Sequence, residues 1–185
     1  MARRFLLCGL AALAFGLVVG AEDKAAKPAE KAEKATKADG SAAFEKMKKL
    51  AGTWVAADKD GKPTDQVVSV IKVTTGGSTV HETLFPGQPH EMVSVYHLDK
   101  GELVMTHYCA LGNQPKMKAD PESPKNQIHF QFVGGTNFDP AKDKHMHEGT
   151  LTFHDDDHIE FCGVAWDGGK PSTEVCTPMK LTRKK

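Results

Sequence analysis

The sequence predicts an all-β protein, a single antiparallel up-and-down barrel of about ten strands with a short helix at its N-terminal end. Two observations support this fold class. From Gly52 onward, runs rich in Val, Ile, Thr, Phe and Tyr alternate with polar residues, which is the period-two pattern of half-buried strands. Turn residues such as Asp60-Gly61, Gly76-Gly77 and Lys100-Gly101 interrupt these runs at the spacing of about 8–12 residues that is typical of barrels and sandwiches.

The helix and the strands can be placed along the chain. Phe44, Met47 and Leu50 recur at the spacing of one helical face, so we expect a helix over residues 42–50. The alternating runs that follow predict strands near 52–58, 66–75, 78–85, 90–99, 102–111, 114–119, 126–133, 145–153, 158–166 and 173–183.

The N-terminal region indicates export. Arg3 and Arg4 precede an apolar run, and Val19-Gly20-Ala21 provides the small residues of a cleavage site, so residues 1–21 are predicted to be a secretory signal peptide. Residues 22–43 are rich in Lys, Ala and Glu and have almost no large apolar side chain, which predicts a disordered tether. Residues 44–185 would then form the barrel, in the periplasm or outside the cell, with no stable membrane span after cleavage.

Alternation within hairpins predicts which side chains face the barrel interior. A two-residue turn at Lys100-Gly101 would place Leu98 opposite Leu103, Tyr96 opposite Met105 and Ser94 opposite His107, all facing inward. A turn at residues 155–157 would place Phe153 opposite Ile159, Leu151 opposite Phe161 and His147 opposite Ala165, with His145 and His147 inside and Cys162 outside. A slip of one residue in either hairpin would reverse these assignments.

The cysteines predict one disulfide. Beyond the signal peptide the chain keeps Cys109, Cys162 and Cys176, and alternation places Cys162 and Cys176 on the outer face of neighbouring strands. We expect a Cys162–Cys176 disulfide, because an exported protein meets oxidising conditions. Metal ligation by the two cysteines is the alternative.

The segment Leu50-Ala51-Gly52-Thr53-Trp54, where a short helix runs into a strand that begins with Gly-x-Trp, resembles the N-terminal signature of lipocalins and the wider calycin superfamily. The resemblance implies that Trp54 closes the barrel floor and that a basic residue of the last strand, here Arg183, packs across its ring. A guanidinium over an indole gains about 0.5–2 kcal/mol. The stretch from Thr106 to Pro115 is similar to one found in exported bacterial barrel proteins of unknown function. The C-terminal histidine motif of haem-binding members is not matched, since no His follows His158.

No catalytic motif identifies an enzyme. The chain lacks a Gly-rich phosphate loop, a Gly-x-Ser-x-Gly elbow, a His-Glu-x-x-His helix and a Cys-x-x-Cys pair, so no catalytic residue and no cofactor is assigned. Its 24 basic and 24 acidic residues give a formal net charge of zero, which argues against nucleic acid as a partner.

We therefore expect a non-enzymatic barrel that binds a small hydrophobic or amphipathic molecule in its lumen. The residues expected to line the lumen are Tyr96, Met105, His107, Cys109, Phe130, His147 and Phe161. Two alternatives stay open. One is a metalloprotein or enzyme that uses His107, His145 and His147, although no metal site is assigned, and the other is an envelope interaction module whose barrel is filled with side chains.

Overall fold

The computed structural model describes residues 40–172 and 178–185. The predicted signal peptide, nearly all of the predicted tether, and Cys176 lie outside these residues. The described chain begins at Gly40 and enters helix α1 (Ser41–Lys49) at once, so the helix starts one residue before the predicted position. Gly40 lies against the turn of a hairpin, where its N–H donates to the Gly101 carbonyl at 2.8 Å. A Cβ at this position would lie 2.5 Å from the Leu103 nitrogen, so the close approach requires glycine.

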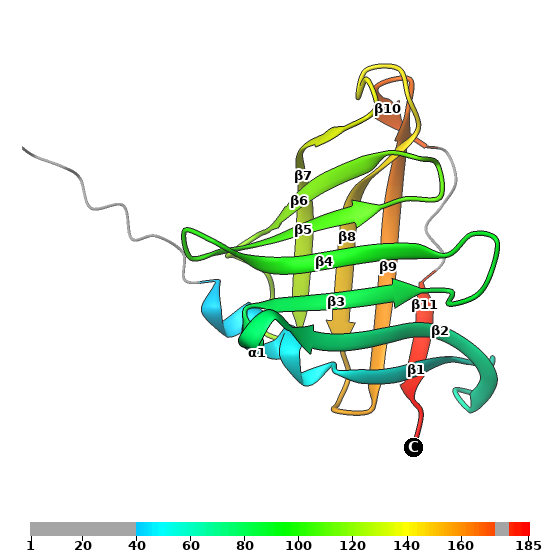
Figure 1. Cartoon of the computed structure of the whole chain (residues 1–185). Coiled ribbons are helices and arrows are strands. Elements are labelled where there is room, and N and C mark those ends of the chain that lie inside the picture. Colours follow the sequence, from blue (N-terminus) through cyan, green and yellow to red (C-terminus); the bar gives the residue numbers. More distant parts are fainter. Residues whose placement is uncertain (1–39, 173–177) are drawn as a thin grey trace, which may run out of the picture. The chain divides into compact units, whose positions relative to one another are not determined.

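The predicted fold class is confirmed: ten antiparallel strands form a closed up-and-down barrel (Figure 1). Each strand of the ring pairs with its neighbours in the chain, β11 pairs with both β9 and β1, and the β8–β9 ladder completes the closure. The strands are β1 (Gly52–Ala57), β2 (Pro63–Thr74), β3 (Thr79–Leu84), β4 (Met92–Asp99), β5 (Glu102–Tyr108), β6 (Gln114–Ala119), β7 (Gln127–Thr136), β8 (His145–Phe153), β9 (His158–Asp167) and β11 (Met179–Arg183). A 3-10 turn, η1 (Thr75–Gly77), joins β2 to β3.

Strand boundaries differ from the prediction at several places, among them the end of β5, at Tyr108 rather than residue 111, and the end of β7, at Thr136 rather than residue 133. Strand β2 begins at Pro63, a position that proline tolerates because the first residue of a strand need not donate a ladder hydrogen bond. The two-residue strand β10 (Lys170–Pro171) pairs with the end of β9 and was not expected, because such a short strand has no periodicity.

The β4–β5 hairpin has the predicted register. Leu98 lies opposite Leu103, Tyr96 opposite Met105, and Ser94 opposite His107. Lys100 and Gly101 both have positive φ, 51° and 85°, as a two-residue turn of this kind requires.

The β8–β9 hairpin follows its predicted register only in part. Phe153 lies opposite Ile159 and Leu151 opposite Phe161, as predicted. The ladder then shifts between Met146 and Glu148, so that Ala165 lies opposite Met146. The predicted pairing of His147 with Ala165 is therefore wrong, because a β-bulge inserts one extra residue into β8.

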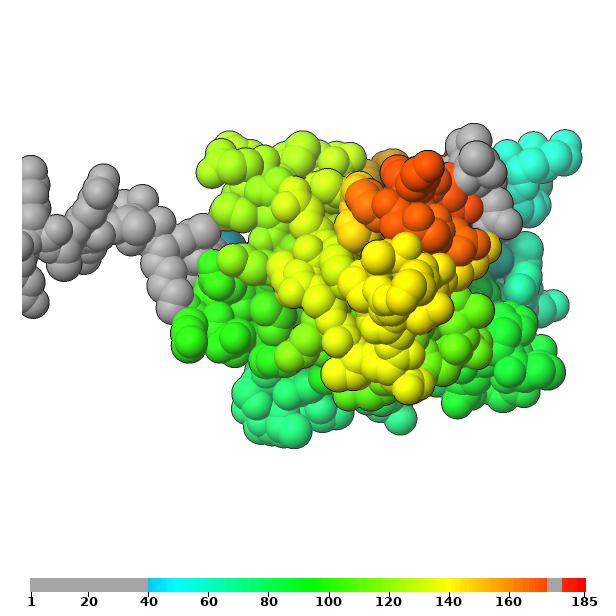
Figure 2. Space-filling view, turned by 90° about the horizontal axis from the view of Figure 1, so that it is seen from above, coloured from blue at the N-terminus to red at the C-terminus, as the bar shows by residue number. Residues whose placement is uncertain are grey.

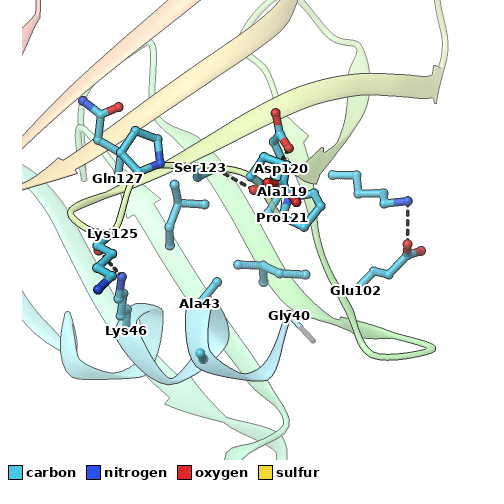
Figure 3. A pocket seen from close by; sticks show the side chains of 16 residues that line it. Gly40, Ala43, Lys46, Glu102, Ala119, Asp120, Pro121, Ser123, Lys125 and Gln127 are labelled. Atoms are coloured by element: carbon cyan, nitrogen blue, oxygen red, sulfur yellow. Dashed lines mark hydrogen bonds and ion pairs between the residues drawn. The ribbon is translucent and has the colours of Figure 1, made fainter. Parts of the chain in front are cut away.

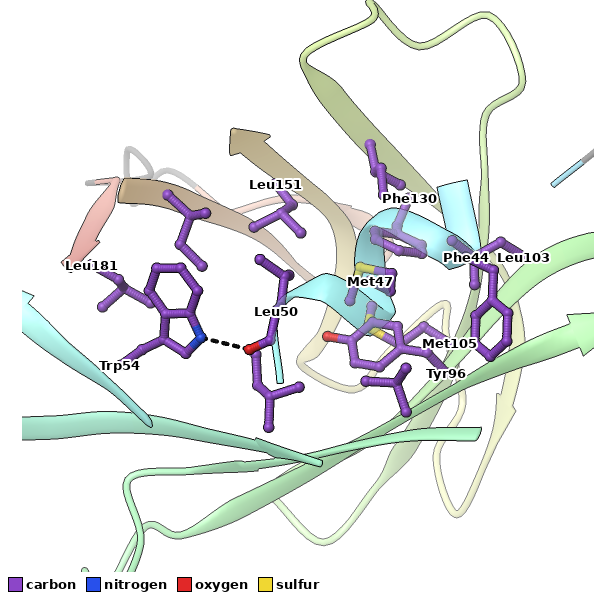
Figure 4. Close-up of a cluster of buried hydrophobic side chains, with 14 of the residues drawn as sticks. Phe44, Met47, Leu50, Trp54, Tyr96, Leu103, Met105, Phe130, Leu151 and Leu181 are labelled. Atoms are coloured by element: carbon purple, nitrogen blue, oxygen red, sulfur yellow. Dashed lines mark hydrogen bonds between the residues drawn. The ribbon is translucent and has the colours of Figure 1, made fainter. Parts of the chain in front are cut away.

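The floor of the barrel is closed by helix α1, Trp54 and Arg183. The Trp54 side chain is fully buried, and its Nε1 donates to the Leu50 carbonyl at 2.9 Å (Figure 4). The Arg183 guanidinium lies 4.4 Å from the centre of the indole ring and donates to the carbonyls of Lys49 and Ala51 at 3.0 and 2.8 Å. One side chain thus covers the indole and satisfies carbonyls at the C-terminal end of the helix.

Candidate functional site

The barrel encloses a cavity of about 40 Å³ between the helix and the strand walls. Most of the residues that line it are apolar, and four polar residues lie together on one side. The apolar lining is formed by Met47, Leu50, Ile71, Leu84, Phe130, Met146, Leu151, Ile159, Phe161, Met179 and Leu181, and the polar lining by Glu82, Ser94, Tyr96 and His107.

The polar residues form a row across three neighbouring strands. Glu82 of β3 is the direct partner of Ser94 on β4, and Ser94 is the direct partner of His107 on β5. Tyr96 lies two residues after Ser94 and faces the same side. Because partner residues on one face of a sheet have neighbouring side chains, the barrel wall itself assembles this cluster. We call these four residues the polar wall.

Glu82 is held by two hydrogen bonds. The Ser69 hydroxyl donates to its Oε1 at 2.7 Å and the Tyr96 hydroxyl donates to its Oε2 at 2.6 Å. Burial raises the pKa of the Glu82 carboxyl above its ordinary value, and the bonds from Tyr96 and Ser69 partly oppose that rise. Within the described chain no Lys or Arg forms an ion pair with Glu82. Among the described residues, the Glu82 carboxyl group therefore has no lysine or arginine as a partner of opposite charge.

His107 and Tyr96 complete the polar wall. His107 Nδ1 and the Ser94 hydroxyl lie 2.9 Å apart, and burial lowers the pKa of His107 to about 4, so its imidazole is neutral at pH 7. Burial, with the neighbouring Glu82 next in importance, raises the pKa of Tyr96 well above its ordinary value. At neutral pH both side chains are uncharged hydrogen-bonding groups.

Helix α1 supplies an apolar boundary of the cavity at the barrel floor. Its inward face carries Phe44, Met47 and Leu50, all buried, and Figure 4 shows Met47 and Leu50 between Tyr96, Phe130 and Leu151. Met47 and Leu50 line the cavity directly. The three residues expected to form one helical face therefore fix one boundary of the site.

The predicted lumen residues divide into two groups. Tyr96, His107, Phe130 and Phe161 line the cavity. Met105 is buried in the core but does not line the cavity, because its position on β5 is displaced from His107 by two residues. Cys109 lies beyond the end of β5, in the turn before Asn113, and is a half-buried free thiol.

His147, the last of the predicted lumen residues, lies in an aromatic stack outside the cavity lining. Its ring stacks on Trp166 at 3.8 Å between centroids and on Phe132 at 4.6 Å. Its Nδ1 lies 3.0 Å from Nε2 of His145, which is fully buried. The bulge that places His147 here also brings Met146 into the cavity lining. The two histidines are near the end of the barrel where the β7–β8 connection and the β9–β10 turn project (Figures 1 and 2).

His145 and His147 do not form a three-ligand metal site with His107. His107 bonds Ser94 in the polar wall, whereas His145 and His147 contact each other and the aromatic stack. Within the described residues no three His, Cys, Asp or Glu side chains are grouped as metal ligands.

The predicted lumen residues omitted most of the cavity lining, and the two omissions of greatest consequence are Glu82 and Met146. Glu82 could have been found from alternation, because it lies between Val80 and Leu84 on one face of its strand, and both neighbours are buried. Met146 could not be found in this way, since regular alternation would have turned it outward.

A separate groove of about 490 Å³ lies on the outside of the barrel, between α1 and the β6–β7 connection (Figure 3). Lys46 bonds the Lys125 carbonyl across it, and Lys118 pairs with Glu102 at 2.7 Å at its other end. Basic and acidic side chains alternate around the groove, so it presents no uniform charge to a ligand.

Comparison with known proteins gives no match, either to a protein-family model or to a curated protein. Among the described residues, no helix has the length and apolar character needed to cross a membrane.

Proposed function

We propose that this protein is an exported, lipocalin-like binding barrel that takes a small, mainly apolar molecule into its lumen without catalysing a reaction. The observation that carries the proposal is the asymmetry of the cavity lining. Apolar side chains from α1 and from the strands surround most of the cavity, and the polar wall occupies one side. This combination of an apolar lining with a few grouped polar side chains is typical of small-molecule sites.

The cavity must expand to accept a ligand. Its volume of about 40 Å³ is far below the roughly 300–1,000 Å³ of typical ligand pockets. Met47, Met146 and Met179 line it, and methionine side chains adapt readily because they are unbranched and have three rotatable bonds. Rearrangement of these side chains provides room for a ligand without a change in the strand ladder.

Assignment to the calycin superfamily and to an exported location rests on other features. The Gly-x-Trp segment, the contact of Arg183 with the Trp54 ring and the apolar N-terminal run support it. The predicted Cys162–Cys176 disulfide belongs to the same proposal, and Cys176 lies outside the described residues. Titration of the unreduced protein, as isolated after removal of residues 1–21, should then find one reactive thiol, that of Cys109, and three thiols would rule out the bridge.

The small cavity volume also favours a second candidate, an interaction module with a filled barrel. Exposed apolar side chains occur on its outer surface, with Leu111 and Val133 each 58% exposed. In this case partners would contact the loops and the outer wall, and the lumen would be part of the core.

A lumenal substitution distinguishes the two candidates. Leu84 lines the cavity, so Leu84→Phe should fill much of it, whereas Val133→Phe adds the same ring to the exposed side of β7. We expect calorimetric titration with 1-hexanol to detect binding to the wild-type protein and to Val133→Phe but at least about tenfold weaker binding to Leu84→Phe, given that it remains folded by circular dichroism. Absence of 1-hexanol binding to the wild-type protein would favour the filled barrel.

A further inference from the structure

We propose that the polar wall selects a protonated amine at one end of an otherwise apolar ligand, with Glu82 as the counter-ion. This inference rests on the proposed function and names the chemical class of its ligand. It is argued from the charges around the cavity, the free acceptor positions of Glu82 and the cost of burying its carboxylate.

The charged side chain that lines the cavity is acidic. Among the described residues that line it, Glu82 is the one carboxylate, and there is no Lys or Arg. His107, the other ionisable base of the lining, is neutral at pH 7 because burial lowers its pKa. A ligand carboxylate would therefore meet a negative group and no cation, whereas an ammonium would meet a group of opposite charge.

The Glu82 carboxylate has acceptor positions to spare. A carboxylate offers about four lone-pair positions, and Ser69 and Tyr96 use one on each oxygen. These two donors also fix the carboxylate in place, and each oxygen has one further acceptor position for which the described residues provide no side-chain donor. An ammonium has three donors and no acceptor, so it complements this group.

A bound cation would relieve an electrostatic cost that the empty barrel carries. The Glu82 residue is partly buried, and this burial raises the pKa of its carboxyl, because an ionised carboxylate is expensive to remove from water without a partner of opposite charge. Charge-assisted hydrogen bonds between ammonium and carboxylate are about twice as strong as neutral ones. The amine end of a ligand would supply the partner that the described protein residues do not provide.

The opposite side of the cavity suits an apolar tail. Phe161, Met146 and Met179 line it and come from β8, β9 and β11, which are on the far side of the barrel from β3 and β4 in the order of the strands. A ligand with its amine at Glu82 would direct its hydrocarbon part toward these side chains.

Three probes of equal chain length test the inference: 1-hexylamine, 1-hexanol and hexanoate, each titrated calorimetrically into the purified protein at pH 7.5. We expect hexylamine to bind more tightly than hexanol by about tenfold or more, which is the range of a hydrogen bond to a charged group, and hexanoate to bind most weakly. If hexanol binds but hexylamine binds no more tightly than hexanoate, the proposed selection of an amine is overturned, while the lumenal site remains supported. Failure of all three probes to bind would overturn the proposed function and the inference together.

A matched pair of variants assigns the selectivity to one carboxyl group. Glu82→Gln keeps the size of the side chain but removes its charge and replaces one acceptor oxygen with an NH2 donor, and it should abolish the preference for hexylamine over hexanol. Glu160→Gln is the control, because Glu160 lies on β9 next to the inward-facing Phe161 and pairs with His154 on the outside. An unchanged preference in Glu82→Gln would contradict the inference.

The wild-type protein gives a second, independent readout if Glu82→Gln does not fold. Affinity for hexylamine should rise with pH through the pKa of the Glu82 carboxyl, whereas affinity for hexanol should stay constant. The groups around Glu82 are Ser69, Tyr96 and Ser94, with His107 further along the polar wall and His81 acting through space from the same strand. His81→Gln should therefore keep the response to pH, and equal pH profiles for hexylamine and hexanol would overturn the inference.

Discussion

The β4–β5 and β8–β9 hairpins carry similar sequences of alternating apolar and polar residues, yet they deliver their histidines to different places. The first keeps its ladder register from the turn to Tyr108, so His107 reaches the cavity. The second keeps its register to Glu148 and is then shifted by the bulge at His147, which places His147 between Trp166 and Phe132. One inserted residue is enough to separate a cavity-lining histidine from a packing histidine.

This difference predicts that the two histidines contribute differently to the loss of stability in acid. The largest change in the free energy of unfolding is expected from His107. Burial lowers its pKa to about 4 in the folded protein from the ordinary value of 6.5, so the unfolded chain takes up the proton first as the pH falls. The neutral imidazole should make its full contribution to the free energy of unfolding above about pH 6.5. This contribution should be lost by about pH 4, a change of roughly 3 kcal/mol.

Urea unfolding between pH 7 and pH 4.5 measures this effect. His107→Asn, which can retain a hydrogen bond to Ser94, should show a smaller loss of stability on acidification than the wild-type protein. His154→Asn, at an exposed position beside the β8–β9 turn, is the matched control. Equal acid sensitivity of His107→Asn and the wild-type protein would show that His107 is not buried in its neutral form.

The second prediction concerns the stacking of His147. His147→Ala removes two stacked ring contacts, with Phe132 and Trp166, and an edge contact with His145. Since an aromatic pair contributes about 0.5–1.5 kcal/mol beyond its area burial, we expect the two stacked contacts alone to account for a loss of about 1–3 kcal/mol in the free energy of unfolding. Hexanol affinity should stay unchanged, because Met146 and not His147 lines the cavity. A large loss of hexanol affinity in a folded His147→Ala protein would place His147 in the site after all.

The smallest change in the free energy of unfolding is expected at the turn of the β4–β5 hairpin. Lys100 has a positive φ of 51°, a conformation in which asparagine is favoured over other residues with a side chain. Lys100→Asn should therefore stabilise the protein by about 0.5–1 kcal/mol in thermal or urea unfolding. Lys72→Asn, in the regular part of β2, should give no such gain. An equal gain in stability from Lys72→Asn would show that the positive φ at Lys100 is not the cause.

The sequence was sufficient for the architecture where local patterns are regular. Phe44, Met47 and Leu50 predicted the helical face that packs over the cavity, and the Lys100-Gly101 turn predicted the register that places Ser94 opposite His107. These features depend on short-range periodicity and on turn chemistry, which a single sequence displays directly.

The missed parts of the site depend on non-local structure. The bulge at His147 depends on how β8 pairs with β9. The sequence of residues 145–148 alone does not predict a bulge. The inward position of Glu82 was not predicted, because carboxylates seldom lie in a protein interior and the chain has 24 acidic residues from which to choose. Its role becomes visible only when Ser69 and Tyr96, from the strands on either side, are seen to bond it.

The position of β11 as the last strand of the ring in chain order has a consequence for the order of folding. The ring contains no direct β1–β9 pairing, and its last five-residue strand fills that gap. Until Arg183 has been synthesised, β1 and β9 remain open edges with unpaired backbone groups, which can recruit other chains. Shortening the chain by only its final few residues should therefore promote self-association, long before it removes any residue of the polar wall.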